Sequence, residues 1–274
     1  MSANWKLTLA YDGSDFNGWQ VQPGLPTVQG TLAEAIARIC GENVLPQGSG
    51  RTDTGVHALG QVASFTLNAP IPAQNLMRAL NRTLPPALRV VAAETAAEDF
   101  HARHSAQSKW YEYRIYRGEV CPPSLCRYVY ALNWPLNQDA MQQAALALVG
   151  EHDFTSFAAS DPDRTTRSNH GIDRRVENEQ ERREQAQKQE PDEPNNTRIL
   201  YNSGWSFDAD HWTYRVHGSG FLHHMVRNLV GTLLSVGRGQ FAPDQMPALL
   251  AARNRAVTGA TAPARGLFLA KVIY

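Results

Sequence analysis

The chain has 274 residues, of which 42% are hydrophobic and 19% are charged, and its 26 basic and 26 acidic side chains give a net charge of zero. This composition indicates a globular protein, long enough for one large domain or for two halves with separate cores. The first residues lack a basic segment followed by an apolar run, and no stretch reaches the roughly 20 apolar residues of a membrane span, so neither export nor membrane insertion is expected.

The first half of the chain mixes strand and helix patterns. Residues 5–11 alternate apolar and polar side chains, which predicts a strand, and an Asp-Gly turn follows it. Apolar residues three or four positions apart predict a helix that includes Val28 and ends at Gly41. Further strands are predicted over 61–67, 89–94 and 109–116, and a further helix over 73–84. The side chains on one face of the last of these strands are Tyr111, Tyr113 and Ile115.

The second half repeats this mixture of elements. A helix is predicted over 138–149, followed by strands over 199–207 and 212–217. A helix over 222–236, a shorter one from Pro243 and a closing strand over 267–273 complete the pattern. Because strands and helices mix without a regular βαβ repeat, we predict an α+β fold with a mainly antiparallel sheet. We divide it into an N-terminal half over 1–106 and a C-terminal half over 107–274.

A charged insert interrupts the C-terminal half at about 173–198. Its residues 173–193 include eight acidic and five basic side chains, with Val176 and Ala186 almost alone as apolar residues. Such a segment has too little apolar surface to form a core, which predicts a solvated helix or a disordered insert. A partner-binding role is the less favoured alternative.

Charge is unevenly distributed outside the insert. From His211 to the C-terminus, seven basic residues stand against Asp244 alone. The seven are Arg215, Arg227, Arg238, Arg253, Arg255, Arg265 and Lys271. Basic residues gathered in one region are expected of a protein that binds a polyanion, although a solvated surface with scattered arginines has the same composition.

The three cysteines, Cys40, Cys121 and Cys126, are too few and odd in number for a disulfide framework. They indicate ordinary thiols in a reducing cytoplasm, and no zinc site is predicted from them. His223 and His224 form a second possible metal pair. Adjacent residues of a helix point in different directions, so ion ligation is not predicted there either.

Residues 48–61, GSGRTDTGVHALGQ, form a glycine-rich loop that places Arg51 close to Asp53. The loop lacks the Gly-Lys-Ser/Thr ending of a phosphate-binding loop, and Asp53 stands where a dinucleotide-binding loop needs its third glycine. The triplet from Asp53 to Gly55 matches that of aspartic proteases, in which two carboxylates share one proton. Since no second triplet occurs, a protease would require a dimer. The simpler alternative is an aspartate that bonds its own backbone in a turn.

Five stretches of the sequence resemble the bacterial tRNA pseudouridine synthase A family. They are YDGSDFNGWQ at 11–20, GRTDTGVH at 50–57, FHARHSA at 100–106, FLHHMVRNLVG at 221–231 and TAPARGLFL at 261–269. The resemblance extends from about residue 5 to the C-terminus. It implies two similar α/β halves that flank a central catalytic cleft. It also implies a cofactor-free isomerase that converts uridine to pseudouridine at positions 38 to 40 of the tRNA anticodon arm, and a homodimer in which one tRNA contacts both subunits.

The resemblance also implies roles for individual residues. The family's catalytic aspartate corresponds to Asp53, its flanking arginine to Arg51, its active-site tyrosine to Tyr111, its carboxylate-pairing arginine to Arg227 and its pocket leucine to Leu267. Two positions depart from the family pattern. Thr54 stands where alanine is usual, and His104 stands where an aromatic residue is usual. The charged insert is also longer than the common pattern.

These residue types suit a reaction that breaks the bond from N1 of uracil to the ribose and forms a new one from C5. A carboxylate at Asp53 can add covalently to the ribose or base, or stabilise charge as the glycosidic bond loosens. Arg227 beside it favours the charged carboxylate. Tyr111 offers an aromatic face to a flipped-out base and a phenol for proton movement. We expect Leu267 to form an apolar wall, and Arg51 to hold phosphate or fill the space left by the base, on glycines that let the backbone approach RNA.

Each of these residues also has an ordinary structural explanation. Tyr111 fits a plain sheet aromatic, Arg227 a surface arginine on a helix, and His57 either a general base or a structural residue. At the level of function, the alternatives are a tRNA-binding protein without turnover and a dimeric aspartic protease built on Asp53.

Overall fold

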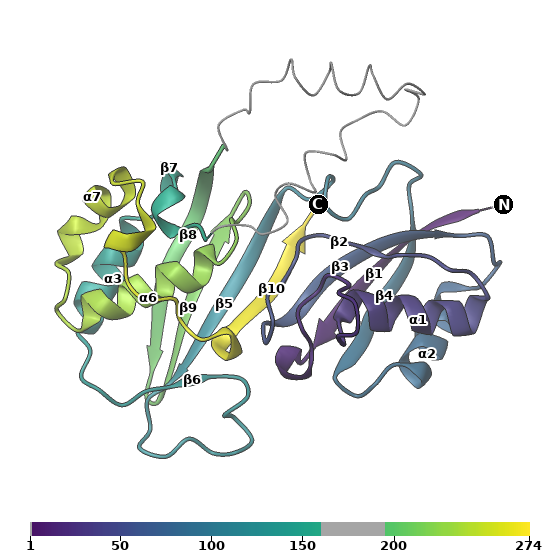
Figure 1. Ribbon diagram of the computed structural model, residues 1–274, viewed down its shortest axis with the longest axis horizontal. Helices are drawn as coiled ribbons and strands as arrows, with labels where there is room; N and C mark the ends of the chain where they lie inside the picture. The colour runs from purple at the N-terminus through teal and green to yellow at the C-terminus, as the bar shows by residue number, and fades with distance from the viewer. Residues whose placement is uncertain (1, 160–194) are drawn as a thin grey trace.

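The computed structural model describes residues 2–159 and 195–274. The strands in this part of the chain form one ten-stranded sheet, in the order β4-β1-β3-β10-β5-β9-β8-β7, with β2 added to β3 and β6 to β5 (Figure 1). The strands are β1 (Ala3–Tyr11), β2 (Gln47–Gly48), β3 (His57–Leu67), β4 (Leu88–Ala96), β5 (Ser108–Tyr116), β6 (Tyr130–Ala131), β7 (Gly150–Asp153), β8 (Thr197–Asp208), β9 (His211–Gly218) and β10 (Leu267–Ile273). The helices are α1 (Val28–Cys40), α2 (Ala73–Thr83), α3 (Gln138–Leu146), α6 (Met225–Gly237) and α7 (Met246–Ala251), with short 3-10 turns between them.

The closing strand β10 lies at the middle of the sheet. It runs parallel to β3, with Phe268 beside His57, and antiparallel to β5 on its other side. The short β6 also pairs in parallel, with β5, and all other pairs of the sheet are antiparallel. The predicted α+β class with a mainly antiparallel sheet is therefore confirmed. The division into 1–106 and 107–274 falls between β4 and β5 and stays a prediction, because one continuous sheet does not test it.

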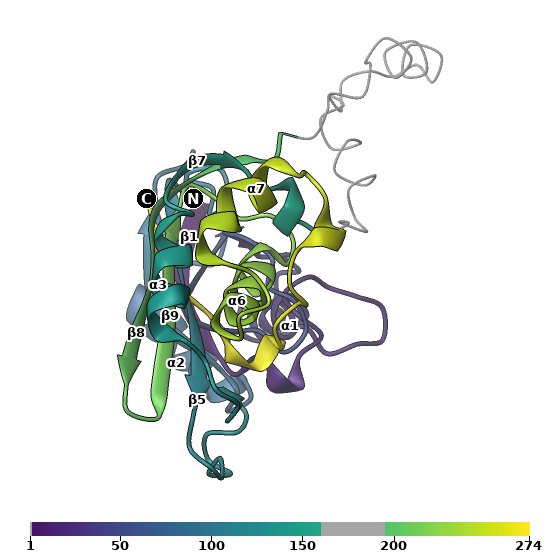
Figure 2. The ribbon, with the colours of Figure 1, turned by 90° about the vertical axis from the view of Figure 1, so that its left-hand side faces the viewer.

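The helices α1, α2 and α6 lie on one face of this sheet (Figures 1 and 2). Every second residue of β1 from Trp5 to Tyr11 is buried. In β5 the buried apolar residues are Tyr111, Tyr113 and Ile115, as the alternation predicted, and the residues between them are partly exposed. The buried apolar residues of both parts of the sheet belong to one continuous core, so the sheet is stabilised along its length by the same burial of apolar surface.

Local sequence signals predicted the end of one helix correctly and the start of another wrongly. Thr27 caps α1 by accepting a hydrogen bond from the backbone N–H of Gly30, and Gly41 ends the helix with φ of 69°, as predicted. The helix predicted over 222–236 begins instead at Met225. The reason is His224, whose φ of 58° places it in the left-handed region and prevents the helix from starting earlier.

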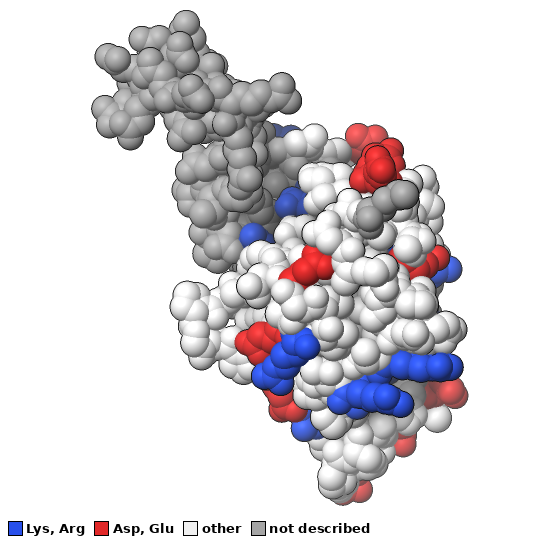
Figure 3. Space-filling model, turned by 90° about the vertical axis from the view of Figure 1, so that its right-hand side faces the viewer, with Lys and Arg blue, Asp and Glu red and all other residues white. Residues whose placement is uncertain are grey.

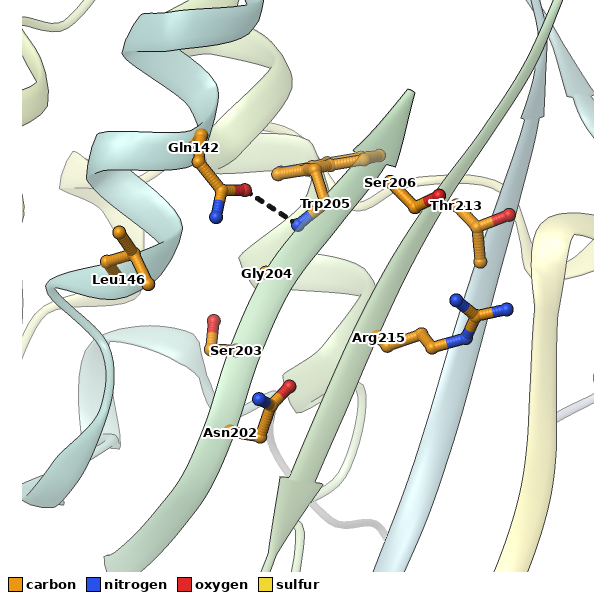
Figure 4. Close-up of a pocket in the computed structure, with 9 residues that line it drawn as sticks. All are labelled: Gln142, Leu146, Asn202, Ser203, Gly204, Trp205, Ser206, Thr213 and Arg215. Atoms are coloured by element: carbon orange, nitrogen blue, oxygen red, sulfur yellow. Dashed lines mark hydrogen bonds between the residues drawn. The ribbon is translucent and has the colours of Figure 1, made fainter. Parts of the chain in front are cut away.

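Part of the edge of β8 is closed by α3. Pairing with β7 covers β8 only from Thr197 to Leu200. Further along, the backbone N–H of Trp205 donates to Oε1 of Gln142 on α3 at 2.8 Å (Figure 4). A hollow of about 270 Å³ lies beside this contact, lined by residues of α3, β8 and β9. A side chain thus satisfies a backbone donor that would otherwise be open to another strand.

One predicted helix is shorter in the structure, and most of one predicted segment lies outside the described residues. The helix predicted over 138–149 ends at Leu146. The charged insert predicted at about 173–198 lies outside the described residues as far as 194, and β8 begins at Thr197. Among the helices of the described residues, none is long and apolar enough to cross a membrane.

Candidate active site

Residues 49–56, here called the Asp53 loop, connect β2 to β3 and rest on the segment that follows β1. The backbone N–H of Trp19 donates to the carbonyl of Thr52 at 3.0 Å. Gly18 has φ of 81°, and a Cβ added there would lie 2.6 Å from the same carbonyl oxygen. Only glycine fits both conditions. The loop closes with a bond from the N–H of Val56 to the carbonyl of Asp53 at 3.1 Å, a turn made by the backbone and not by the aspartate side chain.

His57, at the end of the Asp53 loop, is a structural residue. The backbone N–H of Gly13 donates to its Nδ1 at 3.0 Å, so Nε2 carries the proton and faces the carbonyls of Arg127 at 2.9 Å and Arg265 at 3.2 Å. The ring is fully buried. Burial lowers the pKa of His57 despite the nearby Asp12 carboxylate, which keeps the ring neutral. Both nitrogens are engaged with protein, so the general-base alternative has no support here.

The opposite side of the Asp53 loop rests on buried polar groups. The hydroxyl of Ser49 donates to Oε1 of Gln61 at 2.7 Å, and Nε2 of Gln61 donates to the carbonyl of Gly50 at 2.9 Å. Nζ of Lys109 donates to the carbonyl of Ser49 at 2.7 Å. Burial, together with the charge of Arg103, lowers the pKa of Lys109 to about 8. The loop is therefore held by specific hydrogen bonds on both sides.

Asp53 forms an ion pair with Arg227, 174 residues away in the chain. Nη1 of Arg227 donates to Oδ2 of Asp53 at 3.0 Å, and the exposed fractions of the two side chains are 16% and 22%. Nε of Arg227 donates to the carbonyl of Ala262 at 2.8 Å, and the N–H of Ala262 returns a bond to the carbonyl of Arg227 at 3.1 Å. The guanidinium is thus fixed from α6 and from the segment before β10. This contact excludes the reading of Arg227 as a surface arginine.

A partly buried network of hydrogen bonds holds the segment that carries Ala262 against α6. The Nη2 of Arg255 donates to Oδ1 of Asn228 at 3.1 Å and to the hydroxyl of Thr261 at 3.0 Å. The hydroxyl of Thr261 also donates to Oδ1 of Asn228 at 2.7 Å. Asn228 is fully buried and follows Arg227 directly, so this network supports the position of the arginine.

His223 and His224 both face Asp53, which corrects the prediction that they point in different directions. Nε2 of His224 lies 3.3 Å from Oδ2 of Asp53, and Nε2 of His223 lies 3.6 Å from Oδ1. The prediction assumed that both residues lie within a helix, but α6 begins after them and His224 has a positive φ. Burial lowers the pKa of His224, against the attraction of the Asp53 charge.

The remaining predicted site residues are Tyr111, Leu267 and Arg51. Tyr111 is buried and meets Phe221 edge-on, with ring centroids 4.9 Å apart. Burial raises the pKa of Tyr111, with smaller contributions from Tyr11 and from the charge of Asp53, so the phenol stays protonated. Leu267 is buried at the start of β10 and pairs with Tyr113. Arg51 is exposed on the Asp53 loop.

The segment before Leu267 touches the Asp53 loop. A Cβ added to Gly55 would lie 3.4 Å from Cβ of Ala264, and the hydroxyl of Tyr113 donates to the carbonyl of Pro263 at 2.8 Å. The structure therefore brings Asp53 and Arg227 into contact and places β5 and the start of β10 beside them. The two departures from the family pattern are peripheral, because Thr54 and His104 are both exposed.

Sequence reasoning found the motif at 11–20 without giving it a role. Gly18 and Trp19 support the Asp53 loop, and Tyr11 donates or accepts a bond of 2.9 Å with the hydroxyl of Thr52. The glycines and aromatics of that motif were the available signal. The roles of Lys109 and Gln61 had no such signal, since a single polar residue in a strand pattern indicates nothing by itself.

The basic residues of the C-terminal segment are partly engaged within the fold. Arg215 pairs with Glu112 at 3.0 Å, and Arg253 pairs with Asp153 at 2.9 Å. At the end of the molecule formed by α1 and α2, basic and acidic side chains lie interspersed (Figure 3). A surface for a polyanion therefore stays a prediction, to be tested by binding.

Comparisons with known proteins cover nearly the whole chain. A family model described as tRNA pseudouridine synthase matches residues 8–105 and 144–274. The tRNA pseudouridine synthase A of Solibacter usitatus is 45% identical over 270 residues, and the alignment covers 98% of each chain. The proteins of the same name from Moorella thermoacetica and Bacillus pumilus are 45% and 40% identical over 273 residues, again covering 98% of each chain. The ranges matched by the family model include Asp53, Arg227 and Leu267, while Tyr111 lies between them.

Proposed function

The chain belongs to the tRNA pseudouridine synthase family, and from this premise we propose that it converts uridine to pseudouridine at positions 38 to 40 of the tRNA anticodon arm, with Asp53 as the catalytic carboxylate. The observation that carries the proposal is the 3.0 Å contact between Asp53 and Arg227. It joins residues of two sequence motifs that lie 174 residues apart in the chain. A direct contact between them is expected if the two motifs form one site.

The reaction needs an anionic oxygen held close to the target nucleoside. Asp53 either adds covalently to the ribose or base, or stabilises positive charge as the bond from N1 to the ribose loosens. Both routes use the ionised carboxylate, and Arg227 stabilises that charge through a direct hydrogen bond. Because Nε of Arg227 is bonded to Ala262, the guanidinium keeps its orientation while the carboxylate reacts.

The surrounding residues hold the detached uracil. Tyr111 is a neutral phenol in a buried position, which provides a stacking surface and a proton donor rather than a base. Leu267 supplies an apolar wall that limits the movements of a free base to rotation. Arg51, exposed on the Asp53 loop, is placed to contact the RNA backbone or to fill the space left by a flipped nucleotide.

The proposal includes a homodimer that acts on tRNA in the cytoplasm without an added cofactor. Its support is the near-complete similarity to proteins named tRNA pseudouridine synthase A. Sedimentation at micromolar protein, with and without tRNA, measures the oligomeric state directly.

The test of the function is Asp53→Asn, assayed on anticodon-arm RNA with a readout for pseudouridine. Asparagine keeps the shape of the side chain and removes the negative oxygen. We predict near-normal tRNA binding and a turnover reduced by at least about four orders of magnitude, roughly 5 kcal/mol of transition-state stabilisation. Asp99→Asn, at an exposed position far along the chain, is the matched control and should keep full turnover. Turnover of Asp53→Asn within tenfold of wild type would make Asp53 a turn residue only.

The two alternative functions give different outcomes in this assay. A tRNA-binding protein without turnover leaves uridine unchanged in the wild type. A dimeric aspartic protease needs the Asp53 of a second chain beside the first, so that the two carboxylates share one proton. Cleavage of peptides at acid pH, blocked by an aspartic protease inhibitor, would support it.

A further inference from the structure

Three side chains that bind transition metals converge at Asp53. Nε2 of His224 lies 3.3 Å from Oδ2 of Asp53, and Nε2 of His223 lies 3.6 Å from Oδ1. One ligand atom from each of the three residues lies within 4.8 Å of the others. The side chains are 22% to 29% exposed, so an ion from solvent can reach them.

The ligand types match a tetrahedral zinc centre, and the separations approach its geometry. Zinc binds histidine nitrogen and carboxylate oxygen at about 2.0–2.2 Å, which places two ligand atoms of a tetrahedron about 3.3–3.6 Å apart. The two distances from Asp53 to the histidines fall in this range. Two histidines and one carboxylate are also an established zinc ligand set that leaves a fourth position open. The two distances end on different carboxylate oxygens, and the three ligand atoms lie within 4.8 Å of one another, so an ion can bind once these side chains draw closer together.

The backbone holds the two imidazoles in place. His224 has φ of 58°, a conformation that a residue with a side chain seldom adopts, and this turn lets adjacent residues face the same carboxylate. The two ring centroids lie 4.0 Å apart. The carbonyl of His223 accepts a bond from the N–H of Ala159 at 3.0 Å, and the carbonyl of His224 accepts one from Asn228 at 3.0 Å.

Arg227 would be the hydrogen-bond partner that holds the metal-binding carboxylate of Asp53 from outside the ligand set. Carboxylates that bind metals are themselves held by further hydrogen bonds, and Nη1 of Arg227 already donates to Oδ2 of Asp53. The positive charge of the guanidinium opposes a cation at the same time. The expected affinity for the ion is therefore below that of a dedicated zinc enzyme. Such a site would be occupied only when the concentration of free metal ion rises.

We infer that Asp53, His223 and His224 bind a divalent first-row transition metal ion, with zinc the best match to the ligand set, and that the bound ion inhibits isomerisation by occupying the Asp53 carboxylate. The binding follows from the geometry alone. The inhibition rests on the proposed function of Asp53.

The binding test uses untagged protein and Co²⁺, whose tetrahedral complexes absorb visible light, followed by displacement with Zn²⁺. The double variant His223→Gln/His224→Gln is expected to bind at least about 100-fold more weakly than wild type, because even the loss of outer partners costs 10- to 100-fold. The matched control is His101→Gln/His104→Gln, which removes another close pair, with ring centroids 4.3 Å apart, and should leave the affinity unchanged. Equal affinity in wild type and in His223→Gln/His224→Gln overturns the site.

The inhibition test compares turnover in chelator with turnover in buffered free zinc. At about ten times the dissociation constant, zinc should lower wild-type turnover about tenfold, in line with occupancy. In the double variant, the ratio of the two rates should stay near one, whatever its basal rate. Equal inhibition of both proteins, or of neither, overturns inhibition at this site. A wild type without turnover in chelator contradicts the proposed function, and the inhibition with it, while the absorbance measurement still decides the binding.

Discussion

Replacing Gly18 by alanine tests whether the segment after β1 positions Asp53. The chain offers a matched control in Gly24, because the two glycines have similar φ values of 81° and 72°. A Cβ at Gly18 would lie 2.6 Å from the carbonyl oxygen of Thr52, whereas a Cβ at Gly24 meets nothing within 4 Å. The cost of a positive φ is therefore shared, and the difference between the two variants isolates the contact with the Asp53 loop.

The magnitude follows from these two terms. A left-handed conformation costs a residue with a side chain about 1–2 kcal/mol, and this loss of stability is expected in both variants. Overpacking against a fixed group costs about a further 1–3 kcal/mol, and this loss of stability is expected only in Gly18→Ala. The contact also displaces Thr52, the neighbour of Asp53, and misplacement of a reacting group by about 1 Å can cost on the order of 100-fold in rate. We therefore expect kcat/KM to fall about 100-fold in Gly18→Ala and to stay within about twofold in Gly24→Ala.

Two measurements decide the outcome. Unfolding in urea gives the difference in stability between the variants, and a pseudouridine assay on anticodon-arm RNA gives the difference in rate. Equal stability and equal turnover in the two variants would refute the argument, because the Asp53 loop would then tolerate the displacement. A loss of stability without loss of turnover would show that the contact supports the fold but not the site.

Three further predictions concern charge. Arg227→Gln should lower kcat/KM about 10- to 150-fold, the equivalent of a charged hydrogen bond of about 1.5–3 kcal/mol, with Arg227→Lys between it and wild type, while Arg238→Gln, at the end of the same helix, should change little. Lys109 has a pKa of about 8 in the fold against the ordinary 10.5 of a solvated lysine, so the unfolded chain binds more protons between these pH values. The stability of wild type relative to Lys109→Met in urea should therefore rise from pH 8 to 10, by up to a few kcal/mol, and the comparison cancels the opposite contribution of buried tyrosines such as Tyr111. The affinity for tRNA should fall steeply as salt rises, through counterion release, and a flat response would contradict a basic RNA surface.

The parts of the fold that the sequence predicted are those set by local rules. The helix from Val28 to Gly41 follows from one apolar face and from a glycine that can adopt a positive φ. The inward face of β5 follows from strict alternation of side chains. In both cases the signal and the structure it specifies lie within the same ten to fifteen residues.

The parts that could not be predicted depend on distant contacts. The insertion of β10 between β3 and β5 brings Phe268 beside His57 and Leu269 beside Tyr111, which are far apart in the chain. The periodicity of the sequence does not predict such pairings. The positive φ of His224 had no signal either, because histidine rarely adopts it and only the packing around Asp53 explains it. The contact between Asp53 and Arg227 was expected only from the family resemblance, and the residues alone left it open.

The glycines at and beside the Asp53 loop were expected to let the backbone approach RNA, which stays a prediction. Gly48, which directly precedes the loop, also has a structural explanation. A Cβ at Gly48 would lie 2.5 Å from the ring of Trp19, so this glycine admits a side chain of the protein itself. Trp19 in turn holds the carbonyl of Thr52 through its backbone N–H. The motif at 11–20 and the motif at 50–57 are therefore one packing unit. Their joint occurrence in a sequence indicates a positioned carboxylate more strongly than either motif does alone.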